Sequence, residues 1–136
     1  MLDLINWNDE YMIGIEEFDV QHMELTLLIN DLLIASQKGH PQENILKQME
    51  MVIKYAKWHF NSEEGLMKIF QYPKLPVHKE EHQQLLIRVE EEMDWMSENI
   101  LAPDKIFKFF NACFRDHITG SDVHMADFIN KARERL

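Results

Sequence analysis

The sequence predicts an all-α protein: an antiparallel up-down four-helix bundle preceded by an extended N-terminal arm. Through four long segments, apolar residues recur at every third or fourth position, which is the spacing of one helix face. Proline is poorly tolerated inside a helix, and the prolines stand between these segments, at Pro41, Pro73, Pro76 and Pro103. No stretch of useful length alternates polar and apolar residues as a strand would.

Composition favours a single domain over residues 1–136. The 24 acidic side chains outnumber the 14 basic ones, which argues against nucleic acid or an anionic membrane as a partner. The lone Cys113 cannot form an internal disulfide. The N-terminus lacks the pattern of a signal peptide, and no apolar run reaches the roughly 18 residues of a membrane span. We therefore expect a cytoplasmic monomer that does not insert into membranes.

Residues 1–18 are predicted to form the arm and residues 19–133 the bundle. Apolar anchors and a bend at Gly14 indicate an extended arm rather than a helix. The first helix is expected to begin with Asp19 as its N-cap and to end near Gln37, closed by Gly39. The others are expected over residues 41–70, from Pro76 to about Ile100, and from Pro103 to about Arg133.

Ionisable residues interrupt the apolar stripe of every predicted helix. Because helix direction alternates in such a bundle, these positions meet at one level near one end. A single histidine in an apolar stripe is more often a hydrogen-bonded core residue than a ligand, but this whole set at one level favours a metal site. The candidates are His22, His59, Glu63, His78, His82, His117 and Asp122. We expect His40 in a loop and His124 on the surface.

Seven candidate ligands exceed what one ion usually takes, so two ions are implied. If Glu63 and Asp122 bridge two six-coordinate ions together with an oxygen from water, one coordination position stays open for a small ligand. Imidazole and carboxylate donors suit iron, with manganese or zinc as alternatives. The absence of a cysteine cluster disfavours an iron–sulfur cluster or a structural zinc site.

The spacing of the last two candidates departs from the helical repeat. His117 and Asp122 are five residues apart, which on an ideal α-helix separates them by about 140°. We predict a π-turn or local unwinding around Gly120 and Ser121 that brings Asp122 onto the metal face.

Several sequence stretches together resemble one known family. They are Ile5-Asn6-Trp7 through Gly14-Ile15, Asp19-Val20-Gln21-His22, His59-Phe60-Asn61-Ser62-Glu63-Glu64, Tyr72-Pro73, His78 with His82, and His117-Ile118 with Asp122. This pattern resembles the hemerythrin family, in particular its single-domain bacterial members, and it covers nearly the whole chain.

The resemblance implies two iron ions joined by an oxo or hydroxo group. It implies one iron held by His78, His82 and His117, the other by His22 and His59, with Glu63 and Asp122 bridging them. Dioxygen would bind reversibly at the second iron, for transport, storage or delivery to an oxygen-consuming enzyme, without catalysis. A di-iron peroxidase, oxidase or nitric oxide reductase is the enzymatic alternative. A third possibility is an oxygen or iron sensor that acts through a separate partner.

One stretch departs from the family pattern. Members commonly carry Trp-Leu in the turn before the fourth-helix histidine, where Cys113-Phe114 stand here. With Ile118, these residues are expected to line the oxygen pocket. A smaller residue beside a larger one is expected to open a side path while narrowing the direct one, which would alter oxygen affinity and autoxidation.

Overall fold

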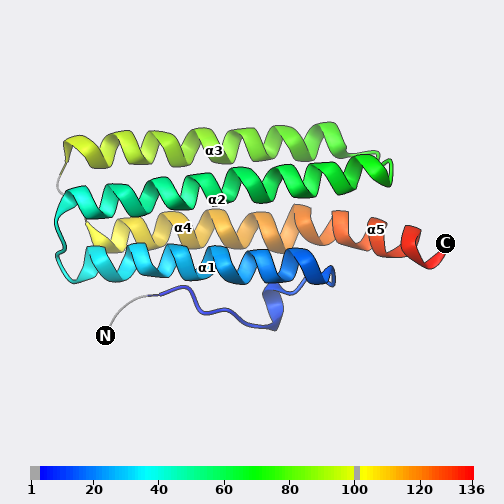
Figure 1. Cartoon of the computed structure of the whole chain (residues 1–136), viewed down its shortest axis with the longest axis horizontal. Coiled ribbons are helices and arrows are strands. Elements are labelled where there is room, and N and C mark those ends of the chain that lie inside the picture. Colours follow the sequence, from blue (N-terminus) through cyan, green and yellow to red (C-terminus); the bar gives the residue numbers. More distant parts are fainter. Residues whose placement is uncertain (1–3, 100–101) are drawn as a thin grey trace.

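The computed structural model describes residues 4–99 and 102–136 of the chain. Over these residues it contains four helical rods and no strand (Figure 1). The helices are α1 (Glu16–Gln37), α2 (Gln42–Ile69), α3 (Leu75–Glu98), α4 (Pro103–His117) and α5 (Val123–Glu134), with α4 and α5 joined into one rod by the π-helix η2 (Ile118–Asp122). The prediction of an antiparallel four-helix bundle is confirmed.

The links between helices follow from a few punctuating residues. Pro41 precedes the first residue of α2, and Pro103 is the first residue of α4. Gly39 closes the preceding helix with a left-handed φ of 71°. The amide of the next residue, His40, then reaches back to the carbonyl of Ala35 at 3.0 Å, as in the common helix-ending motif that uses glycine. Short links of this kind make sequential helices antiparallel neighbours.

The predicted start of the first helix is wrong. We expected Asp19 as the N-cap and the arm to reach residue 18, whereas α1 begins at Glu16 after Ile15. Asp19 lies in the first turn and is buried. Its carboxylate accepts backbone hydrogen bonds from Ile13 at 2.8 Å and Gly14 at 3.2 Å. The side chain therefore ties the arm to the helix instead of capping the helix.

The arm runs beside α1, with the short 3-10 helix η1 (Asp9–Tyr11) along it (Figure 1). Asn30 pairs with the backbone of Ile5 at 2.8 and 2.9 Å, so the described start of the arm is fixed to α1. Residues 1–3 of the predicted arm and the predicted end of the third helix near Ile100 lie outside the described residues.

Apolar side chains fill the space between the rods on both sides of one polar level. The largest fully buried ones are Ile15, Leu32, Leu33, Met49, Met67, Met96, Ile106, Met125 and Ile129. Burying such side chains drives bundle formation, at about 1.5–3 kcal/mol for each large residue. Among the described helices, none combines the length and the apolar composition needed to cross a lipid bilayer.

Candidate metal centre

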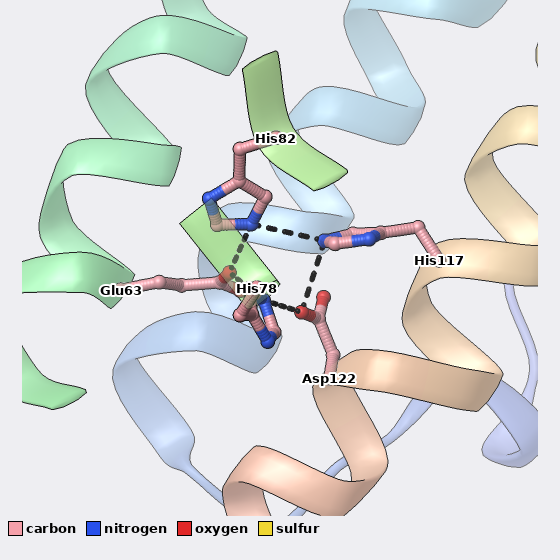
Figure 2. Close-up of side chains that lie close together, drawn as sticks. All are labelled: Glu63, His78, His82, His117 and Asp122. Atoms are coloured by element: carbon pink, nitrogen blue, oxygen red, sulfur yellow. Dashed lines mark hydrogen bonds and ion pairs between the residues drawn. The ribbon is translucent and has the colours of Figure 1, made fainter. Parts of the chain in front are cut away.

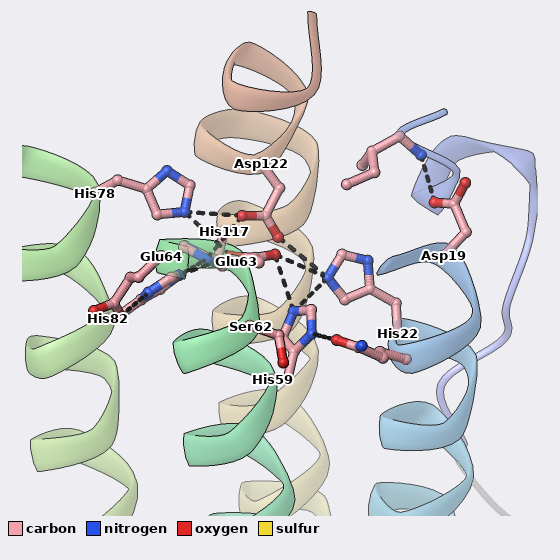
Figure 3. A network of polar contacts seen from close by, with 12 residues as sticks. Asp19, His22, His59, Ser62, Glu63, Glu64, His78, His82, His117 and Asp122 are labelled. Carbon is pink, nitrogen blue, oxygen red and sulfur yellow. Dashed lines mark hydrogen bonds and ion pairs between the residues drawn. The ribbon is translucent and has the colours of Figure 1, made fainter. Parts of the chain in front are cut away.

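All seven predicted ligands come together at one level of the bundle, and each is at most 5% exposed. They come from α1 (His22), α2 (His59 and Glu63), α3 (His78 and His82), the end of α4 (His117) and the end of η2 (Asp122). Figure 3 shows their side chains pointing toward one another from the surrounding helices. The other histidines, His40 and His124, are exposed as predicted.

The ligand atoms form two overlapping groups. Within each group, the candidate nitrogen and oxygen atoms lie within 4.8 Å of one another. The larger group (Figure 2) contains Glu63, His78, His82, His117 and Asp122, and the smaller contains His22, His59, Glu63 and Asp122. Both carboxylates belong to both groups, which is what two bridged ions require.

Glu63 divides its two oxygens between the groups. Its Oε2 lies 3.0 Å from Nε2 of His59, and its Oε1 lies 3.0 Å from Nε2 of His82. The two oxygens have no hydrogen-bond partner of their own, although both are buried. Buried unpartnered carboxylate oxygens are costly, and a cation between them and the imidazoles would remove that cost.

The two oxygens of Asp122 are divided between the groups in the same manner. Its Oδ2 lies 3.3 Å from Nε2 of His22, while its Oδ1 lies 3.1 Å from Nε2 of both His78 and His117. Neither oxygen has a hydrogen-bond partner. Each carboxylate therefore presents one oxygen to each group.

Three outer side chains set which imidazole nitrogen faces the site. Nδ1 of His59 lies 2.6 Å from Oε1 of Gln21. Glu64 contacts Nδ1 of His82 at 2.8 Å, and Glu81 contacts Nδ1 of His117 at 2.8 Å. Because these oxygens accept, each Nδ1 carries the hydrogen. Nε2 of the neutral ring therefore has a free lone pair that faces the site.

The nitrogens facing the site need a cation. Nε2 of His82 and Nε2 of His117 lie 3.0 Å apart, and the Nε2 atoms of His22 and His59 lie 2.9 Å apart. The rings of His82 and His117 both donate outward from Nδ1, so when neutral they present facing lone pairs, which cannot bond to each other. The residues present therefore fit a pair of metal ions.

The pKa values of the clustered residues also favour a bound cation. Burial lowers the pKa of His22, but the carboxylates of Asp122 and Glu63, at 3.3 and 3.5 Å from its Nε2, outweigh it and raise that pKa to about 9. The same balance raises the pKa of His78 to about 9 and that of His117 to about 10. Burial raises the pKa of Glu63, but the neighbouring histidines outweigh it and hold that pKa well below its usual range. The two carboxylates therefore stabilise a positive charge in the cluster, carried either by protonated histidines or by metal ions.

The predicted π-turn is confirmed. η2 covers Ile118–Asp122 and brings Asp122 onto the face that carries His117, despite their five-residue spacing. A Cβ added to Gly120 would meet nothing within 4 Å, so the turn does not need glycine for space.

An apolar cavity of about 70 Å³ adjoins the cluster. Cys113, Phe114 and Ile118, the residues predicted to line the pocket, all border it. Three histidines reach it: His22, His59 and His117; the rest of its described lining is apolar apart from Cys113.

Sequence reasoning missed the outer residues Gln21, Glu64 and Glu81. Each is the immediate chain neighbour of a candidate ligand and contacts a histidine of the next helical rod along the chain. Their position directly beside a candidate ligand is the signal that the sequence offers, but the histidine that each one contacts is set by how the helices pack. Sequence reasoning also missed that Phe60 stacks on His82, with ring centroids 3.9 Å apart and planes 9° apart.

The family model of the hemerythrin HHE cation binding domain matches residues 13–129, which span the whole cluster. The chain belongs to the hemerythrin family. Proteins of this family bind a di-iron centre, and the buried histidine and carboxylate cluster is suited to one. Family membership supports an oxygen-binding or related role and, in general, a binding protein rather than an enzyme.

Relatives and solved hemerythrin structures agree with this assignment. A bacteriohemerythrin of Stenotrophomonas maltophilia (strain R551-3) is 29% identical over 124 residues, covering 91% of this chain and 80% of that protein. One of Clostridium acetobutylicum is 26% identical over 128 residues, covering 89% and 98%. A wild-type hemerythrin crystal structure superposes with a TM-score of 0.84 at 25% identity, covering 93% and 98%. A leucine-to-tyrosine hemerythrin mutant gives 0.83 at 25% identity, covering 93% and 97%.

Proposed function

We propose that this chain binds dioxygen reversibly at a non-heme di-iron centre. The expected ligands are His78, His82 and His117 for one iron, His22 and His59 for the other, and Glu63 with Asp122 as bridges. When bound, the two irons would supply the two electrons that dioxygen takes up and gives back, and a hydroxo group between them would supply the proton. The chain's own part is to hold the donors rigidly and to keep water out.

The observation that supports this proposal is which of the clustered histidines line the apolar cavity. His22 and His59, from the group with fewer ligands, both line the cavity, whereas His78 and His82 do not. His117 also reaches it. The group with a coordination position to spare therefore faces an apolar space, which suits a small uncharged molecule and tends to stay dry.

The cavity lining favours binding over catalysis. Apart from the three histidines and Cys113, its described lining is apolar, so no added carboxylic acid is placed to deliver a proton to bound dioxygen. Phe114 packs at a ring-centroid distance of 6.4 Å from His22 and covers this side of the cluster. Excluding water in this manner protects a reversible site from side reactions.

The test is visible absorption spectroscopy of iron-loaded protein, reduced without air, exposed to oxygen and then purged with argon. We expect a charge-transfer band that appears with oxygen and disappears on purging over several cycles. A band that decays irreversibly, together with turnover of added peroxide, would instead indicate the redox enzyme. A ligand-dependent interaction with a separate protein would indicate a sensor.

We further propose that the chain works as a single-domain cytoplasmic monomer that transports or stores oxygen, or delivers it to an oxygen-consuming enzyme. The charge of −10 favours repulsion between copies, which supports the monomer. Sedimentation of the iron-loaded protein at several concentrations tests this, and a concentration-dependent dimer would contradict it.

A further inference from the structure

Glu81 contacts both ends of the π-turn η2 from a different helix. It lies on α3, between His78 and His82. Its Oε1 is 2.8 Å from Nδ1 of His117, the last residue of α4. Its Oε2 accepts a hydrogen bond from Oγ of Ser121, the residue before Asp122. One carboxylate therefore joins His117, which precedes the π-turn, to Ser121, the residue directly before the candidate ligand Asp122.

A π-turn needs such support. It replaces regular α-helical bonding with a wider turn, and such local departures persist where surrounding contacts hold them. Regular α-helix would place Asp122 about 140° from His117 around the axis. In the π-turn, Oδ1 of Asp122 lies 3.1 Å from Nε2 of His117. Any relaxation toward regular helix would therefore turn Asp122 away from the cluster.

We propose that Glu81 is a positioning residue that orients His117 and, by holding Ser121, also aims Asp122. This inference rests on the ligand roles proposed above for His117 and Asp122. Ionised Glu81 can only accept hydrogen bonds, so it keeps the hydrogen of His117 on Nδ1 and leaves Nε2 free for an ion. The same side chain thus orients a terminal ligand and a bridging ligand.

Glu64 is a matched comparison within the same site. Its Oε2 lies 2.8 Å from Nδ1 of His82, the same contact that Glu81 makes with His117. His82, however, lies within the continuous α-helix α3. Loss of Glu64 should therefore disturb one ligand and leave the π-turn intact, whereas loss of Glu81 should disturb both.

The experiment compares Glu81→Ala, Glu81→Gln, Ser121→Ala and Glu64→Ala with the parent chain. Backbone amide hydrogen exchange of residues 118–123 in metal-free protein reports on the π-turn without any oxygen chemistry. Calorimetry with Zn²⁺ as a redox-inert probe reports the number and affinity of bound ions. Glutamine is the conservative replacement, because its oxygen can accept from His117 while its amide donates to Ser121.

We expect Glu81→Ala and Ser121→Ala to speed exchange across the π-turn at least several-fold, and Glu64→Ala to leave it unchanged. Glu81→Ala and Glu64→Ala should each weaken Zn²⁺ binding by about 10–100-fold, the usual effect of losing an outer partner. Glu81→Gln should restore both properties to near the parent values.

Unchanged exchange in Ser121→Ala and in Glu81→Ala, or equal acceleration in Glu64→Ala, would overturn the role of Glu81. If Glu81→Ala does not fold, Ser121→Ala compared with Glu64→Ala still decides the matter: unchanged exchange across the π-turn in Ser121→Ala would overturn the role of Glu81. If the parent protein binds Zn²⁺ but its iron-loaded form does not bind and release oxygen, only the proposed function is contradicted. A parent chain that binds no ion would contradict the ligand roles themselves.

Discussion

Nε2 of His117 lies 3.1 Å from Oδ1 of Asp122, although five residues separate them along one helical rod. The π-helix Ile118–Asp122 produces this contact by widening one turn. It also gives Asp122 its place between the two ligand groups, with Oδ2 directed to His22. A local irregularity of the backbone thus brings Asp122 into the candidate metal centre.

Asp122→Asn should abolish stable binding of two ions, because an amide has one accepting oxygen where two are used, and it lacks the negative charge. We expect iron to fall from two to one or fewer per chain. Elemental analysis after desalting measures this. The control is Asp116→Asn, an exposed aspartate on α4, which should keep the parent iron content. Two irons retained in Asp122→Asn would exclude Asp122 as a bridge.

Cys113→Trp should slow autoxidation several-fold. Cys113 is partly exposed and borders the cavity, so a larger apolar side chain there would narrow the path by which water reaches the site. The rate is measured from the loss of the oxygenated absorption band in air. Ala112→Trp, at an exposed neighbouring position, is the control. An unchanged rate in Cys113→Trp would remove this residue from oxygen access.

The metal-free protein should lose stability as the pH rises. The pKa values of His22 and His78 are about 9 and that of His117 about 10, all above the ordinary 6.5. A group whose pKa is higher in the folded than in the unfolded protein stabilises the folded state. The stabilisation is complete when the pH is below the pKa of the unfolded state, and it is lost as the pH rises through the pKa of the folded state. We therefore expect a lower Tm at pH 10 than at pH 6.5. A Tm that is flat or rises over this range would contradict the charge balance described for the cluster.

The metal-loaded protein should respond to acid instead, because protons and metal ions compete for the same imidazole nitrogens. We expect iron to be released on acidification to pH 4, followed by recovery on neutralisation with added Fe²⁺. Chelator-trapped iron quantifies the release. Full iron occupancy at pH 4 would show that the histidines are not the ligands.

Asp19→Ala should destabilise the protein by about 1–3 kcal/mol, the cost of leaving buried backbone donors unpaired. The affected amides are those of Ile13 and Gly14. Urea unfolding measures the loss, and earlier proteolysis of the arm should accompany it. Asp31→Ala, on the exposed face of α1, should change stability far less. Equal stability of the two variants would mean that Asp19 does not tie the arm.

The bundle and the seven clustered residues could be predicted because both depend on periodicity. Apolar spacing defines which helix face is buried, and His22 or Glu63 on such a face stands out as an exception. The π-turn could also be predicted, since a five-residue spacing between His117 and Asp122 conflicts with the α-helical repeat.

Two features depended on contacts that the sequence does not encode locally. Asp19 has the residue type and position of an N-cap, but its carboxylate bonds to the arm that precedes the helix. Glu64 and Glu81 resemble ordinary solvated glutamates on a helix surface. Their roles depend on which histidine of the neighbouring helix they meet, and this is set by the register between helices.

The most direct test of reversible oxygen binding is oxygen uptake and release by reduced, iron-loaded protein, followed with an oxygen electrode and normalised to iron content. We expect one dioxygen to be taken up per two irons and recovered when the oxygen pressure is lowered. Uptake without recovery would contradict reversible binding, and the absence of any uptake by fully loaded protein would contradict an open position facing the cavity.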